Sequence, residues 1–150
     1  MVNEMLGNQY FLARDYVSAE RELLPCLEKN PESKPVKRKL IICYTQLGQV
    51  SRALEMFNDL ISQDIDFVID ADEVLDDCPC PELLDNNEQV YLTDESGDNF
   101  LILGMLWLYC DIESSIKYFR KALELDQDNI LIKKVLNRIE NYHKSHPQDK

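Results

Sequence analysis

Lysine and arginine are missing from the middle of this 150-residue chain. Residues 53–116 carry seventeen aspartate and glutamate side chains and no basic one, and they account for the net charge of −12. Residues 1–52 and 117–150 each have a small positive balance. A central acidic block disfavours nucleic acid and an anionic membrane as partners, and its field favours a protein or peptide that is basic.

Long apolar runs are also missing. The longest, Phe100 to Cys110, has eleven residues, whereas a membrane-spanning helix needs about 20. The N-terminus lacks the basic start and apolar core of a signal peptide, so a cytoplasmic protein is expected. Glycine occurs only four times and no glycine- or serine-rich linker divides the chain, which predicts a single domain.

Histidine occurs only twice, at His143 and His146, and no nucleophile motif or phosphate-binding loop is present. This scarcity of acid–base groups predicts a protein that is not an enzyme and has no cofactor. No partner ligands lie near the two histidines in the sequence, so a frayed, solvated C-terminal tail is a better interpretation than a metal pair.

The five cysteines are an odd number, which favours reduced thiols. Cys26, Cys43 and Cys110 fall in helical patterns, where a thiol usually serves as a small apolar filler. Cys78 and Cys80 are separated by one proline, which is closer than the usual spacing of zinc ligands. We therefore expect a proline-stiffened turn with half-buried thiols, and the alternative is a metal-responsive site.

A repeated amphipathic pattern is what the chain does contain. Tyr16–Ser33, Gln49–Asp66 and Ile112–Asn129 each place apolar residues at i, i+3, i+4 and i+7, which predicts a helix. Each follows another helix-like stretch and a short turn, and Ala19 and Ala53 take the same position 34 residues apart. Helix, tight turn and helix at this period predict an all-α solenoid of stacked hairpins.

The period places three repeats at about residues 3–33, 36–66 and 99–129, and a capping helix at 130–143. The acidic segment 67–98 between them has two interpretations. It is either a degenerate repeat, with a helix from Ile65, a proline turn and a short second helix, or a flexible acidic loop. Within it, Asp94 to Asn99 resembles half of a calcium loop, but Met105 stands where the closing glutamate belongs. A helix start with Asp98 as its N-cap is the better explanation.

In these features the sequence resembles the tetratricopeptide repeat family, whose repeat combines an aromatic residue, Leu-Gly, Tyr, Ala, Phe and Pro. The first copy matches at Leu6, Gly7, Tyr10, Ala19, Leu23 and Pro31. The second matches at Leu40, Tyr44, Ala53 and Phe57. The third keeps Phe119 and the run from Ala122 to Asp126, but departs at Ile102, Leu103, Leu106, Ser115 and Gln127. The alternative is an unrelated helical bundle with chance periodicity.

The resemblance implies a concave groove, lined by the first helix of each hairpin, that receives a partner segment. Helical phase predicts that nine residues face it: Glu4, Asn8, Phe11, Arg38, Ile42, Thr45, Gly104, Trp107 and Leu108. Trp107 is either a binding hot spot or a packing residue. Arg38 either pairs with an acidic ligand group or is surface charge beside Lys37 and Lys39.

Some members of the family bind the C-terminal carboxylate of heat-shock chaperones. Asn8 matches one residue of that set, but Glu4 replaces a required basic residue and would repel a carboxylate. The preferred function is therefore a non-catalytic interaction module or adaptor for another protein segment. Two alternatives remain, a small acidic chaperone similar to those of bacterial secretion systems, and the metal-responsive protein using Cys78 and Cys80. A homodimer is also left open, because apolar solenoid faces often self-associate.

Overall fold

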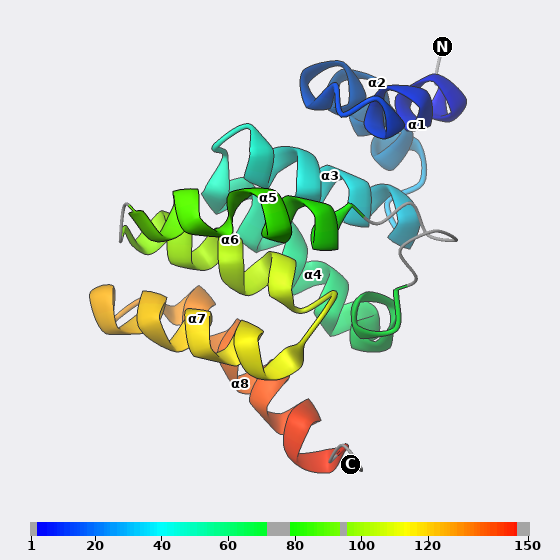
Figure 1. The fold of residues 1–150 in the computed structure, drawn as a ribbon. Coiled ribbons are helices and arrows are strands. Elements are labelled where there is room, and N and C mark those ends of the chain that lie inside the picture. The colour runs from blue at the N-terminus through cyan, green and yellow to red at the C-terminus, as the bar shows by residue number, and fades with distance from the viewer. Residues whose placement is uncertain (1–2, 72–78, 94–95, 147–150) are drawn as a thin grey trace. The chain divides into compact units, whose positions relative to one another are not determined.

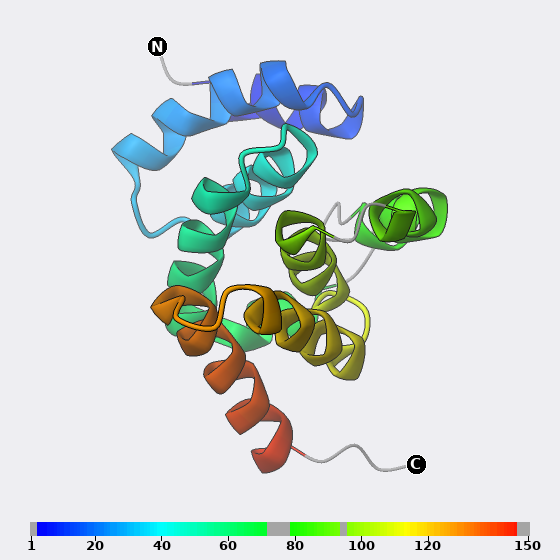
Figure 2. The same ribbon diagram turned by 90° about the vertical axis from the view of Figure 1, so that its left-hand side faces the viewer.

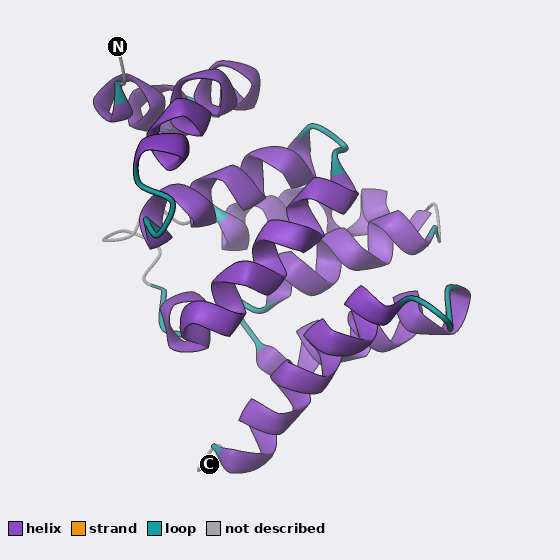
Figure 3. Cartoon of the chain, turned by 180° about the vertical axis from the view of Figure 1, so that it is seen from behind, coloured by secondary structure: helices purple, strands orange, loops and turns teal. Residues whose placement is uncertain are grey.

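The structure, a computed structural model, describes residues 3–71, 79–93 and 96–146, without the side chains at positions 86 and 87. Over these residues the chain forms helices joined by short loops and contains no strand (Figure 3). None of the helices described is long and apolar enough to cross a membrane. The expected all-α class is therefore confirmed.

The chain divides into two compact units, Met1–Leu60 and Ile61–Lys150. The first contains α1 (Glu4–Leu12), α2 (Tyr16–Lys29), α3 (Lys34–Gln46) and most of α4 (Val50–Ile69). The second contains the end of α4, α5 (Cys80–Thr93), α6 (Gly97–Trp107), α7 (Ile112–Leu125) and α8 (Ile130–Ser145) (Figure 1). The boundary between the units lies inside α4, and the single cooperative domain expected from the sequence stays a prediction.

Short polar side chains begin several of these helices. The side chains of Asn3, Asp15 and Asn129 each accept a hydrogen bond from the backbone amide three residues later, which satisfies a donor that the helix leaves free. The cap of α6 is Ser96, whose Oγ accepts from the Asn99 amide at 3.2 Å. The expectation that Asp98 caps this helix is wrong, because Asp98 lies inside its first turn.

The two turns of the first unit have the same backbone geometry. Arg14, between α1 and α2, has a φ of +64°, and Gly48, between α3 and α4, has a φ of +75°. In both turns the next residue's amide donates to the carbonyl five residues before it at 2.9 Å, from Asp15 to Tyr10 and from Gln49 to Tyr44. This left-handed helix ending recurs after 34 residues, the period read from the sequence.

Small residues stand where helices of the first unit approach closely. A Cβ atom on Gly7 would lie 2.7 Å from Leu23 Cδ2, so α1 and α2 pack at a distance that only glycine allows. Ala19 and Ala53 are fully buried, as the repeat pattern predicts. Arg52 on α4 lies over the Tyr44 ring of α3 at 4.9 Å, which adds a cation–π contact to the packing between these two helices.

In the second unit α5 packs on α6, α6 on α7 and α7 on α8 (Figures 1 and 2). The contact between α6 and α7 is as close as the one between α1 and α2. A Cβ on Gly104 would lie 2.9 Å from the Phe119 ring, and the Ser115 hydroxyl donates to the Gly104 carbonyl at 2.6 Å. Gly104 is therefore the small residue at this helix contact. The repeat pattern puts the small-residue position at Leu103, one residue earlier.

The segment between the second and third predicted repeats begins and ends in helix. Asp64 has a non-helical backbone (φ −165°, ψ 90°) that interrupts α4, and its carboxylate accepts from the Phe67 amide at 3.3 Å. The helix expected to begin at Ile65 follows this break and is described as far as Ile69. The expected second helix is present as α5. The expected break at Cys78 lies outside the described residues.

Helix α8 confirms the predicted amphipathic C-terminal helix. Its apolar side chains at Ile132, Val135, Leu136 and Ile139 are buried. Lys133, Lys134 and Arg138 on the other face are exposed. The helix ends at Ser145, two residues later than predicted.

The first testable prediction concerns the left-handed turn at Gly48. Nothing lies within 4 Å of a Cβ added at Gly48, so Gly48→Ala tests the backbone conformation alone. We expect a loss of about 1 kcal/mol in the free energy of unfolding, measured by urea denaturation followed by circular dichroism. Gly97→Ala is the matched control, because Gly97 has equal space and no left-handed φ. Equal effects of the two substitutions would contradict the assignment.

The second prediction concerns the contact between α6 and α7. Gly104→Ala puts a methyl group against the Phe119 ring, and we expect a loss of about 1–3 kcal/mol because a packed interior resists added volume. The double variant Gly104→Ala/Phe119→Leu should lose less than the sum of its two single substitutions. Additive losses in the same urea measurement would show that the two residues are not in contact.

Candidate functional site

The groove residues predicted on α1 differ in exposure. Glu4 is exposed, and Phe11 is fully buried, with its ring edge-on to Tyr16 at a centroid distance of 6.0 Å. Asn8 is half-buried, and its Oδ1 accepts a hydrogen bond from Lys39 Nζ at 2.9 Å. Asn8 therefore already has a partner within the first unit.

The groove residues predicted on α3 are all buried. Arg38 is 4% exposed, Ile42 is fully buried and Thr45 is 3% exposed. The Thr45 hydroxyl donates to the Ile42 carbonyl at 2.7 Å, which satisfies it within its own helix. Lys37 and Lys39 are buried as well, so the interpretation of Arg38 as part of an exposed basic cluster is wrong.

Helix α6 and the residue after it supply the last three predicted groove residues. Gly104 faces Phe119 of α7, so the expectation that it lines an open groove is wrong. Leu108 is buried, at 1% exposure. Trp107 is half-buried, and its indole Nε1 donates to Glu88 Oε2 of α5 at 3.0 Å. Of the two interpretations of Trp107, the structure therefore shows packing within the second unit, and the partner-binding role of the whole set stays a prediction.

Glu88 joins three helices of the second unit. The oxygen that accepts from Trp107 also accepts from the Tyr118 hydroxyl of α7 at 3.1 Å. Burial, and then the bond to Glu88, raise the pKa of Tyr118 to about 12. Glu88 forms no ion pair with any described residue, so this carboxylate is held by neutral donors alone.

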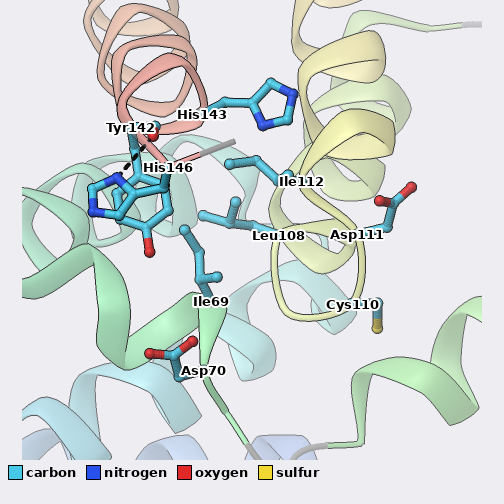
Figure 4. Close-up of a pocket in the computed structure, with 9 residues that line it drawn as sticks. All are labelled: Ile69, Asp70, Leu108, Cys110, Asp111, Ile112, Tyr142, His143 and His146. Atoms are coloured by element: carbon cyan, nitrogen blue, oxygen red, sulfur yellow. Dashed lines mark hydrogen bonds between the residues drawn. The ribbon is translucent and has the colours of Figure 1, made fainter. Parts of the chain in front are cut away.

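A cavity of about 260 Å³ lies elsewhere in the second unit, and we call it the α8 cavity. Three parts of the chain line it: the end of α4, the turn between α6 and α7, and the end of α8 (Figure 4). The lining residues are Ile69, Asp70, Leu108, Cys110, Asp111, Ile112, Tyr142, His143 and His146. The α8 cavity therefore combines an apolar centre with acidic and aromatic side chains.

The aromatic side of the α8 cavity is ordered by several contacts. The Tyr142 and His146 rings stack at a centroid distance of 4.0 Å and an interplanar angle of 10°, as Figure 4 shows. The Tyr142 hydroxyl donates to Asp66 Oδ1 at 2.6 Å. That bond, followed by burial and the charges of Asp66 and Asp70, raises the pKa of Tyr142 to about 12.

Two carboxylates that line the α8 cavity, Asp70 and Asp111, and the carboxylate of Asp66, which bonds to the lining residue Tyr142, lack a cationic partner among the described residues. Asp66, Asp70 and Asp111 form no ion pair with any lysine, arginine or histidine in the described part of the chain. Asp111 accepts from the Ser114 hydroxyl at 2.6 Å and Asp66 from Tyr142, both neutral donors. No cationic side chain of the described residues therefore neutralises these three carboxylates at close range.

The two histidines lie in and just after the end of α8. His143 lies within α8 and is part-buried, so the interpretation of a solvated, frayed end is wrong at this position. His146 follows the helix and is exposed, as expected, but its ring stacks on Tyr142. His143 Nε2 lies 3.9 Å from Glu113 Oε1. Within the described residues no group of three or more histidine, cysteine or carboxylate side chains is placed to hold a metal ion.

The cysteines are only partly where the sequence predicts them. Cys26 and Cys43 are buried fillers, and burial raises the pKa of Cys43 to about 12. Cys110 is exposed in the turn after α6, so its interpretation as an apolar filler is wrong. Cys80 is fully buried rather than half-buried, and Cys78 lies outside the described residues.

The sequence contains no local signal for the α8 cavity. Asp66 and Tyr142 are 76 residues apart, and each belongs to an ordinary helical pattern in which nothing indicates the other. The spacing of Tyr142 and His146 by one helical turn predicts that they share a face, which is the one part that could have been found. The apolar centre of the α8 cavity could not have been found from the sequence, because helical phase assigned Leu108 to the predicted groove.

Comparison of the sequence with models of known protein families finds no match, and comparisons with curated proteins and with solved structures find none either. The geometry of the described residues is therefore the basis for a functional proposal.

The third prediction tests the role of Glu88. Glu88→Ala removes the acceptor of two part-buried donors, and we expect a loss of about 1–3 kcal/mol in the free energy of unfolding. Glu88→Gln keeps an acceptor oxygen and should lose less. The emission of Trp107, the only tryptophan, reports both unfolding and the loss of the bond. Asp85→Ala, at an exposed position on α5, is the control, and an equal loss there would contradict the role of Glu88.

Proposed function

We propose that the chain is a non-catalytic interaction module that binds a basic segment of another protein. The observation that carries this proposal is that Asp70 and Asp111, which line the α8 cavity, and Asp66, which bonds to Tyr142 beside it, have no cationic partner among the described residues. A cationic segment supplies the charge that the chain itself does not supply there.

The distribution of ion pairs supports this choice of partner. In the first unit Arg52 lies 3.6 Å from Glu20, and between α7 and α8 Arg120 lies 2.6 Å from Glu140. Acidic side chains on both sides of the central block therefore have basic partners within the chain. Residues 53–116 contain no basic side chain to match their own carboxylates. The long-range attraction of a basic partner is thus directed at this part of the chain.

The resemblance to the tetratricopeptide repeat family belongs to the same proposal. It is supported by the turn that recurs at Arg14 and Gly48 and by the two close helix contacts at Gly7 and Gly104. In that family a helical solenoid binds a segment of a partner and does no chemistry. A solenoid of this kind would present the acidic residues on a rigid scaffold, which lowers the entropy cost of binding.

The fourth prediction tests binding with a defined probe. A fluorescein-labelled 12-residue peptide of arginine, lysine, leucine and serine should bind the chain at 50 mM salt, as measured by fluorescence polarisation. Affinity should fall about ten-fold or more at 300 mM salt, because exposed charges are screened beyond a Debye length. The counterpart peptide, with glutamate at every basic position, should not bind.

Matched charge variants separate a specific site from general attraction to an acidic protein. Asp66→Asn/Asp70→Asn/Asp111→Asn removes three charges at the α8 cavity and should weaken peptide binding. Glu28→Gln/Asp59→Asn/Asp128→Asn removes three exposed charges elsewhere and should change it by less than about two-fold. Equal effects of the two variants, or no binding of the basic peptide, would overturn the proposal.

A further inference from the structure

We infer that the α8 cavity receives a single arginine side chain of the partner, an inference that rests on the proposed function. The guanidinium would lie against the outer face of the Tyr142–His146 stack and pair with the carboxylate of Asp70, which lines the cavity, while Asp66, bonded to Tyr142, adds negative charge nearby. Its methylene chain would lie on the apolar centre of the cavity. The argument has four steps, which concern size, charge, aromatic surface and apolar surface.

The size of the α8 cavity fits one side chain. At about 260 Å³ it is below the range of about 300–1,000 Å³ that is usual for pockets holding a whole small molecule or cofactor. It is also far too large for a single bound water. A long side chain inserted from a partner is an occupant of intermediate size.

The free carboxylates set the charge of the occupant. Tyr142 occupies Oδ1 of Asp66, and no described side chain donates to the other oxygen of Asp66 or to the carboxylate of Asp70. Asp70 is exposed and lies four positions after Asp66 in the chain. A guanidinium has five N–H donors in a planar fork and can bond to more than one carboxylate oxygen at once.

The aromatic stack favours arginine over lysine. The Tyr142 and His146 rings are stacked face to face, with 10° between their planes, so the open aromatic surface at this side of the cavity is an outer face of the stack (Figure 4). A planar guanidinium stacks on such a surface, whereas an ammonium group is a compact, strongly hydrated point charge. The ring orientation is held by the Tyr142–Asp66 bond and by the contact from His146 Nδ1 to the Tyr142 carbonyl at 3.0 Å.

The apolar centre suits the stem of the same side chain. Ile69, Leu108 and Ile112 lie between the aromatic side and the opposite side, where Asp111 and Cys110 are placed (Figure 4). Long cationic side chains bury their methylene groups on apolar surface and keep the charged end near polar partners. One arginine side chain therefore matches the apolar centre, the aromatic stack and the Asp70 carboxylate of the lining.

The fifth prediction is tested by nuclear magnetic resonance on the full chain. We expect N-acetyl-arginine amide to shift backbone amides near residues 69–70, 108–112 and 142–146, with a saturable Kd on the order of millimolar. N-acetyl-citrulline amide has the same shape without the charge and should give no saturable shift. N-acetyl-lysine amide should bind more weakly than arginine. Shifts spread over all acidic positions, or equal affinity for lysine and arginine, would overturn the inference.

Matched variants locate the arginine site. Asp66→Asn/Asp70→Asn keeps an oxygen that accepts from Tyr142 and should weaken the arginine probe about ten-fold. Glu28→Gln/Asp59→Asn removes the same charge at exposed positions and should leave its Kd within about two-fold. The dispersion of the amide spectrum shows whether each variant is folded. If the two double variants bind the arginine probe with equal affinity, arginine binds outside the α8 cavity.

The peptide separates this inference from the proposed function. Replacing every arginine of the 12-residue peptide by lysine keeps its charge, and we expect at least three-fold weaker binding. If the lysine peptide binds equally well, the module still binds basic segments and the arginine site is wrong. If neither peptide binds, the proposed function is wrong. If the free chain self-associates and Asp66→Asn/Asp70→Asn abolishes this, the occupant is a second copy, and the inference of a foreign partner is overturned.

Discussion

The close approach of α6 and α7 at Gly104 is the constraint on which the second unit depends. Because Gly104 has no side chain, the Phe119 ring reaches the α6 backbone and the Ser115 hydroxyl reaches its carbonyl. The two helices are joined by the short turn between Trp107 and Ile112. That turn carries Leu108, which lines the α8 cavity, so the close helix pair and the cavity wall are adjacent in the chain.

The carboxylates of the central block fall into two groups, one structural and one without a structural partner for its charge. Glu88 is a structural group, since its carboxylate accepts from Trp107 and Tyr118 and so holds α5 against α6 and α7. Asp66 and Asp70 have no such structural role, because among the described side chains only the Tyr142 phenol donates to either of them. A neutral donor solvates a carboxylate without compensating it. The charge left over is therefore available to a cation from outside the chain.

Helix positions could be predicted from the sequence because apolar periodicity and turn residues are local. The turns at Arg14 and Gly48 and the helix at Ile130–Ser145 follow the predicted pattern within two residues. Two departures from the prediction each concern a shift by one or two positions. Gly104, rather than Leu103, is the small residue at the contact between α6 and α7. The repeat pattern misses this by one position because it assumes the same hairpin geometry in every repeat. Ser96 caps α6 because its hydroxyl reaches the Asn99 amide.

The sequence by itself determined the helical class, the 34-residue spacing of two turns and the location of the acidic block, since these depend on residue types at short range. Only the tertiary structure decided which side chains meet. It buried Ile42 and Thr45, which helical phase alone had assigned to a groove, and it brought Asp66 to Tyr142 across 76 residues. Helical phase gives the face on which a residue lies, but the neighbour that covers this face is set by packing between distant segments.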